Sequence, residues 1–66
     1  MNIVLNGEQR SLDGALTLRG LIDELELAGK RLAVEVNQEV VPRSEHAAYH
    51  LRDGDRVEIV HAIGGG

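Results

Sequence analysis

The residues with the clearest chemical potential stand at the end of the chain, where Gly64, Gly65 and Gly66 follow an apolar run. Glycine has no Cβ, so a run of glycines can enter a channel that is too narrow for side chains. The accessible functional group is then the terminal α-carboxylate on Gly66, which is ionised at neutral pH and is a poor electrophile. Chemistry there needs outside activation, for instance by ATP. The alternative is an ordinary frayed chain end or a cloning scar.

Histidine and aspartate residues are weaker candidates for chemistry. His46 and His50 are four residues apart, which on a helix would place two metal ligands on one face, but no cysteine or close carboxylate pair completes a site. We expect both to be solvent-exposed structural residues. His61 could act as an acid or a base, although a single histidine in a strand is more often a surface residue. The Asp-Gly-Asp sequence at 53–55 is expected to be a turn. We predict no metal site, no bound cofactor and no catalytic residue.

Composition excludes several classes of function. The 66 residues predict one small domain, and the absence of cysteine excludes disulfides and a thiol nucleophile. Tyr49 is the sole aromatic residue and the net charge is −4, so stacking on bases and contact with phosphate backbones are both disfavoured. The apolar runs are too short for a membrane span or a signal peptide. We expect a soluble, cytoplasmic protein that binds neither nucleic acid nor membrane.

Periodicity predicts the elements that position the tail. Alternation over residues 2–6 and 32–36 is typical of strands, and Asn6-Gly7 favours a tight turn that returns the chain over 8–12. Residues 40–41 form a short strand that Pro42 confines to an edge. A final strand begins at Arg56 and runs into the glycines.

One helix is expected between these strands. Thr17 is a good N-cap, and four apolar residues follow at the spacing of one helix face. Gly29 suits the left-handed position just past the helix end. A single further turn over 45–48 is expected, capped by Ser44.

The order β-β-α-β-β-β predicts an α+β fold in which the sheet packs in two layers on one main helix. Residues 1–63 form the domain and 64–66 a flexible tail. If the first and last strands are neighbours, Val4, Val60 and Ala62 lie on the open side of the sheet and form a docking patch beside the tail. The expected core consists of Ile3, Leu5, Leu18, Leu21, Ile22, Leu25, Leu32, Val34, Val36, Leu51, Val57 and Ile59.

The chain resembles the ubiquitin-like β-grasp family and, within it, the ThiS family of sulfur carriers of thiamin biosynthesis. The resemblance is carried by Asn6-Gly7 in the first turn, by the helix from Leu18 to Leu25 and by the stretch 36–44, which contains Val-Val-Pro-Arg. The stretch 53–60, which begins with Asp-Gly-Asp, and the terminal glycines complete it. The resemblance covers essentially the whole chain. One departure is three terminal glycines in place of two.

The resemblance implies a carrier and not a catalyst. An adenylating enzyme of the ubiquitin-activating type would use ATP and magnesium to activate the carboxylate of Gly66. Sulfur from a persulfide donor would then give a thiocarboxylate, which thiazole synthase would consume. Gly64 and Gly65 would enter the partner active sites. Three alternatives stay open: a molybdopterin-type sulfur carrier, a ubiquitin-like modifier that is joined to lysines, and an interaction domain with an inert tail.

Overall fold

The computed structural model describes residues 1–61, and its elements follow the predicted order. The predicted tail over 64–66 and the end of the predicted last strand lie outside the described residues. The elements are β1 (Asn2–Leu5), β2 (Glu8–Ser11), α1 (Leu18–Glu24), β3 (Leu32–Val36), β4 (Glu39–Val40), the 3-10 helix η1 (Arg43–Glu45) and β5 (Arg56–His61).

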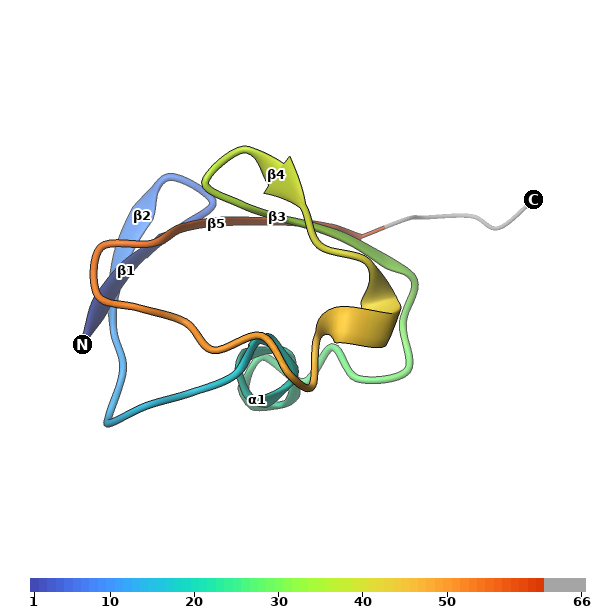
Figure 1. Ribbon diagram of the computed structural model, residues 1–66, viewed down its shortest axis with the longest axis horizontal. Helices are drawn as coiled ribbons and strands as arrows, with labels where there is room; N and C mark the ends of the chain where they lie inside the picture. Colours follow the sequence, from blue (N-terminus) through green and yellow to red (C-terminus); the bar gives the residue numbers. More distant parts are fainter. Residues whose placement is uncertain (62–66) are drawn as a thin grey trace.

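The strands form one mixed sheet in the order β2-β1-β5-β3-β4, and α1 lies against one face of it (Figure 1). β5 pairs in parallel with β1 and antiparallel with β3, so the first and last strands are neighbours, which was the condition for the predicted docking patch. β4 is two residues long and lies at an edge, which confirms the expectation drawn from Pro42. The predicted α+β fold with two layers is confirmed. Within residues 1–61, no helix covers the other face of the sheet.

The hairpin between β1 and β2 turns at Asn6 and Gly7. Their φ angles are +49° and +83°, the left-handed values that the Asn-Gly dipeptide predicts for such a turn. The register places Leu5 opposite Glu8, so the two strands are joined by the shortest common type of hairpin loop.

Helix α1 begins as the sequence predicts. The Thr17 hydroxyl oxygen accepts a hydrogen bond from the Gly20 amide at 3.1 Å, which satisfies one of the free donors of the first turn. The structure also explains the glycine inside this helix. A Cβ on Gly20 would lie 2.8 Å from Cδ1 of Leu16, so the absence of a side chain lets Leu16 pack over the first turn.

The prediction that Gly29 follows the end of the helix is wrong. The helix ends at Glu24, and Glu26 takes the left-handed conformation with φ +59°. The amide of Leu27 then donates to the carbonyl of Ile22 at 3.0 Å, the bond that defines a Schellman motif. Leu27 packs against the core, and this contact stops the helix before the glycine. Gly29 has φ +82° in the turn that follows.

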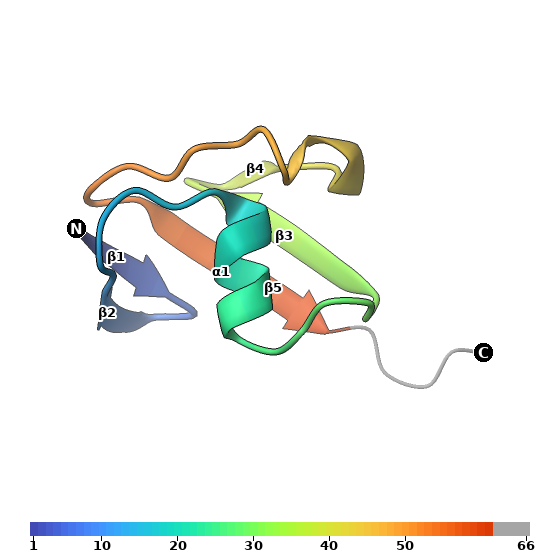
Figure 2. The ribbon, with the colours of Figure 1, turned by 90° about the horizontal axis from the view of Figure 1, so that it is seen from below.

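The core lies between α1 and the inner face of the sheet. Figure 2 shows α1 lying across that face, in front of β5. Nine of the expected core residues are buried, whereas Leu5, Leu25 and Leu32 are only partly buried because they lie at the margins of the two layers. Leu12 and Val41 are buried although the sequence did not single them out. Each follows a strand and turns inward where the chain leaves the sheet. The buried apolar residues are Ile3, Leu12, Leu18, Leu21, Ile22, Val34, Val36, Val41, Leu51, Val57 and Ile59.

The connection between β4 and β5 differs from expectation in two ways. The helical turn is η1, which begins directly after Pro42 without a side-chain cap, so Ser44 lies inside the turn and does not cap it. His46 is buried, with 6 % of its surface exposed, and its Nε2 lies 2.9 Å from the carbonyl oxygen of Val41. The expectation of an exposed His46 is therefore wrong, because this carbonyl gives the imidazole a partner inside the protein. His50 is exposed, as expected.

Candidate functional site

The candidate site is the end of β5, the strand from which the glycine-terminated segment continues. β5 lies in the middle of the sheet and pairs with a neighbour on each side. Five residue pairs join it to β3, from Val36 opposite Val57 to Leu32 opposite His61. Its pairing with β1 is shorter and ends where Leu5 faces Val57. The last four residues of β5 therefore have strand pairing on the β3 side alone.

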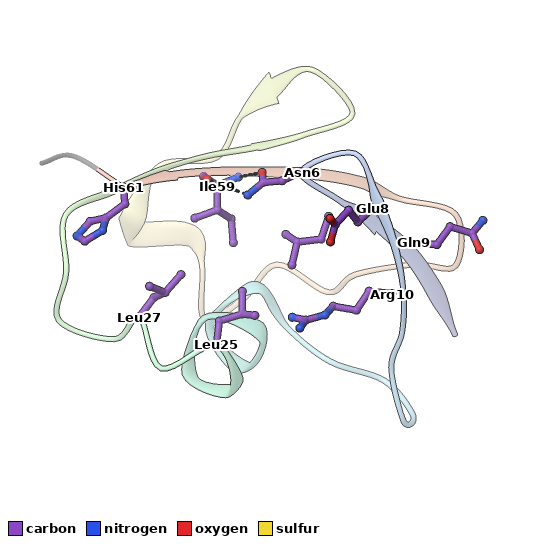
Figure 3. Close-up of a pocket in the computed structure, with 9 residues that line it drawn as sticks. Asn6, Glu8, Gln9, Arg10, Leu25, Leu27, Ile59 and His61 are labelled. Atoms are coloured by element: carbon purple, nitrogen blue, oxygen red, sulfur yellow. Dashed lines mark hydrogen bonds between the residues drawn. The ribbon is translucent and has the colours of Figure 1, made fainter.

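The side chain of Asn6 compensates for the early end of β1. Its Oδ1 accepts a hydrogen bond from the Ile59 amide at 2.9 Å, and its Nδ2 donates to the Ile59 carbonyl at 3.2 Å (Figure 3). The Asn6 amide also donates to the carbonyl of Val57 at 2.9 Å. The side-chain carboxamide of Asn6 thus pairs with β5 as one more strand residue would. It fixes the β5 backbone at Ile59, two residues before His61.

The structure reaches His61, the last residue of β5, whose side chain is exposed. The other residues predicted for the tail and its patch, Ala62, Gly64, Gly65 and Gly66, lie outside the described part of the chain. Their roles stay predictions.

Two of the predicted docking residues can be placed. Val4 is half-buried and Val60 is 63 % exposed, and both lie on the face of the sheet that α1 leaves open. They are not adjacent, however. Val4 lies opposite Arg56, whereas Val60 lies opposite Ala33 on the other side of β5. Arg56 and Glu58 lie between the two valines on that face, so the valines belong to one face but not to one compact patch. Their docking role stays a prediction.

The opposite face of β5 borders a groove that sequence reasoning missed. Its volume is about 420 Å³, and Figure 3 shows it between β1, β2, β5 and the segment after α1. Partly buried leucines and Ile59 form its floor, and Glu8, Arg10 and His61 lie on its rim. The groove exists because α1 ends early and leaves this corner of the sheet uncovered. The residues that line it are Leu5, Asn6, Glu8, Gln9, Arg10, Leu25, Leu27, Ile59 and His61.

The turn at 53–55 has a structural role. The Asp53 carboxylate accepts a hydrogen bond from the Asn2 amide at 2.7 Å, and the Asp55 carboxylate accepts one from the Arg52 amide at 2.8 Å. Asp55 also accepts from Nδ2 of Asn37 at 3.0 Å. Both carboxylates therefore tie the start of β5 to its neighbours, and the prediction of a turn is confirmed.

Metal and membrane features can be assessed over the same part of the chain. Within residues 1–61, no three histidine, cysteine or carboxylate side chains come close enough together to bind a metal ion. No helix in this range has the length and apolar character needed to cross a bilayer.

Comparison with known proteins places the chain in a family. The model of the ThiS family matches residues 3–66. The sulfur carrier protein ThiS of Thermus thermophilus is 42% identical over 62 residues, which cover 94% of this chain and 95% of that protein. The ThiS protein of Geobacter metallireducens has a crystal structure that superimposes with a TM-score of 0.85 and 36% identity over the full length of both chains.

A different relationship links the chain to longer proteins. The thiazole synthase of Paramagnetospirillum magneticum is 44% identical over all 66 residues, but this match covers only 20% of that protein. The chain thus spans about a fifth of the length of the curated thiazole synthases it matches. The family match extends from β1 to the terminal glycines and agrees with the likeness in fold, and on these grounds the chain belongs to the ThiS family.

Proposed function

We propose that this protein is a sulfur carrier of thiamin biosynthesis and that it carries sulfur on the terminal carboxylate of Gly66. The observation that carries the proposal is the ThiS family match over residues 3–66, which includes the glycine end. The relatives from Thermus thermophilus and from Escherichia coli K12 both bear the name sulfur carrier protein ThiS. The Escherichia coli protein is 29% identical over the full length of both chains.

The chemistry proceeds in three steps. An adenylating enzyme of the ubiquitin-activating type binds ATP and magnesium, and an oxygen of the Gly66 carboxylate attacks the α-phosphorus and releases pyrophosphate. The outer sulfur of a persulfide donor then attacks the acyl carbon and displaces AMP, which gives an acyl disulfide. A thiol attacks the donor's sulfur in that disulfide, so the S–S bond breaks, a new disulfide forms and the thiocarboxylate is released on Gly66. Thiazole synthase takes up the sulfur, and an oxygen atom from water or from a carbonyl group of its substrate takes its place, so that Gly66 returns to the carboxylate. The protein is a co-substrate in this sequence, and ATP and magnesium bind to its partner.

The fold supports this role by holding the base of the tail. β5 is paired with β3 as far as His61, and Asn6 holds Ile59 from the other side. A partner that draws Gly64, Gly65 and Gly66 into its active site therefore pulls on the central strand of the sheet. Glycines suit such an entry because they present no side chains to the channel.

The pairing with thiazole synthase has support from the comparisons. A segment similar to this whole chain occurs within longer proteins that bear the name thiazole synthase. Two activities that work in sequence are often joined in one polypeptide, because the link raises the effective concentration of each for the other. The adenylating enzyme and the persulfide donor follow from the family resemblance.

Intact-protein mass spectrometry tests the proposal. The full chain is incubated with ATP, magnesium, the adenylating enzyme and a persulfide donor, and a chain that lacks all three terminal glycines is the control. We expect a mass gain equal to the exchange of one oxygen for sulfur in the full chain alone. Covalent adducts with other proteins would favour a ubiquitin-like modifier. Sulfur transfer to a molybdopterin precursor in place of a thiazole would favour the molybdopterin-type carrier.

A further inference from the structure

The turn between β1 and β2 contains a pair of residues that can react with each other. In an Asn-Gly sequence the backbone nitrogen of the glycine can attack the side-chain amide carbon of the asparagine, because glycine has no Cβ to hinder the approach. The chain has three asparagines, and only Asn6 precedes a glycine. Asn2 and Asn37 precede isoleucine and glutamine, whose side chains crowd the attacking nitrogen. Asn6 and Gly7 are both exposed, so water reaches them.

The reaction of this pair needs only water as a co-reactant. The Gly7 nitrogen forms a bond to Cγ of Asn6, its proton passes through water to Nδ2, and ammonia leaves, which gives a five-membered succinimide ring. Water then adds to one of the two ring carbonyl groups and opens the ring. Cleavage of the new bond to Cγ gives aspartate, and cleavage of the original peptide bond gives isoaspartate. No atom is oxidised or reduced in either step.

The folded chain holds this pair in a geometry that cannot react. Ring closure requires the Gly7 nitrogen to lie on the same side of the Asn6 Cα–C bond as Cβ, whereas the left-handed conformation of Asn6, with φ +49°, turns that nitrogen away from Cβ. The carboxamide is held as well, because Oδ1 accepts from the Ile59 amide at 2.9 Å and Nδ2 donates to the Ile59 carbonyl at 3.2 Å (Figure 3). The turn and both bonds must therefore open before the ring can form.

We propose that Asn6 is a deamidation site whose reactivity is controlled by its pairing with β5. The fold protects Asn6 while its carboxamide is bonded to Ile59, and a local opening of the β1–β2 turn exposes it to ring closure. The loss of ammonia is irreversible, so each opening that leads to reaction leaves a permanent change in the chain. The inference is independent of the proposed carrier function.

The product cannot restore the protected structure. An aspartate at position 6 has no Nδ2 donor and places a carboxylate oxygen against the Ile59 carbonyl, which leaves that carbonyl without this partner. An isoaspartate adds one methylene group to the backbone of a two-residue hairpin loop and disturbs its fit between the strands. Deamidation therefore weakens the hold on the end of β5 from the β1 side.

Peptide mass spectrometry of the full chain, kept at mildly alkaline pH with and without guanidinium chloride, tests the proposal. Deamidation exchanges an NH2 group for an OH group, and fragmentation assigns the exchange to Asn6, Asn2 or Asn37. The Asp-Gly sequences at 13–14 and 53–54 do not interfere, because ring closure and reopening there leave the mass unchanged. We expect exchange at Asn6 before the other two asparagines, and about tenfold faster in the unfolded chain. Equal rates in the folded and unfolded chain would overturn the proposed protection, and an unreactive Asn6 in the unfolded chain would overturn the site itself.

Hydrogen exchange separates a local opening from global unfolding. In low concentrations of guanidinium chloride, the deamidation rate of Asn6 should rise in proportion to exchange at the Ile59 amide and ahead of exchange at the amides of β3. A deamidation rate that follows the β3 amides instead would overturn control by the local contact.

The effect of the product is measured with a pair of variants. Asn6→Asp makes the change that deamidation makes, and Gln9→Glu makes the same change from amide to carboxylate at an exposed residue of β2. We expect Asn6→Asp to lower the melting temperature and Gln9→Glu to leave it nearly unchanged, because only Asn6 donates to the Ile59 carbonyl. Equal melting temperatures for the two variants would overturn the proposed loss of the hold on β5.

Discussion

Asn6 controls the geometry of the strand that precedes the tail more directly than any other described side chain. Its φ angle of +49° and its two side-chain bonds to Ile59 are separate requirements. Asn6→Gly keeps the backbone conformation and removes both bonds. We expect it to lower the free energy of unfolding by about 1–3 kcal/mol, since each net hydrogen bond contributes about 0.5–1.5 kcal/mol.

The measurement is urea unfolding, combined with hydrogen exchange at the Ile59 amide. Exchange at this amide should become faster relative to that of the neighbouring core amides in the Asn6→Gly variant. Unchanged stability and protection would mean that the Asn6 side chain does not hold β5.

His46 and His50 provide a matched pair of variants. His46 is buried and lies 2.9 Å from the Val41 carbonyl, whereas His50 is exposed. His46→Ala leaves the Val41 carbonyl without this partner and should lower the free energy of unfolding by about 1–3 kcal/mol. His50→Ala should have little effect on the melting curve. Equal melting temperatures for the two variants would contradict the structural role of His46.

At the scale of single elements, the end of α1 offers a direct test. Glu26 adopts a left-handed conformation that costs a residue with a side chain about 1–2 kcal/mol. Glu26→Gly removes that strain but adds freedom to the unfolded chain, so we expect a net gain of roughly 0.5–1 kcal/mol in the free energy of unfolding.

Ala28→Gly is the control for this prediction, because Ala28 is exposed and its φ angle is negative. It should lower the free energy of unfolding by about 0.4–1 kcal/mol through the unfolded state. An equal fall in melting temperature for both variants would contradict the assignment of the left-handed conformation to Glu26.

Periodicity predicted the elements well and their ends poorly. The strands, the Thr17 cap and the Asn6-Gly7 turn depend on local preferences, which a sequence displays directly. The end of α1 depends on Leu27 reaching the core, a contact that overrides the signal from Gly29. The burial of His46 depends on the carbonyl of Val41, which comes near only after the β4–β5 connection has folded. The groove beside β5 was missed for the same reason, since it arises from the early end of α1.

At the scale of the whole molecule, the alternation of side chains along each strand was enough to assign Val4 and Val60 to the open face of the sheet. It could not give the distance between them, because that depends on the register of β5 against both neighbours. The chemistry assigned to Gly64, Gly65 and Gly66 stays a prediction, because these residues lie outside the described part of the chain.

Val60→Thr tests whether this face contacts a partner. The substitution keeps the branched shape that suits a strand and replaces one exposed methyl group by a hydroxyl group. We expect an unchanged melting temperature and a loss of about 1 kcal/mol in docking free energy, seen as a higher KM for activation. Val34→Thr, at a position that is 1 % exposed, should have the reverse pattern, with lower stability and an unchanged KM. An unchanged KM for Val60→Thr would place the contact elsewhere.

The most direct test of the carrier function follows one sulfur atom through the cycle. The chain is loaded with a heavy isotope of sulfur, purified away from the donor and incubated with thiazole synthase and its other substrates. We predict that the heavy sulfur appears in the thiazole ring while the mass of the chain returns to that of the carboxylate. A thiazole that contains only light sulfur, with the heavy atom retained on Gly66, would contradict the carrier role.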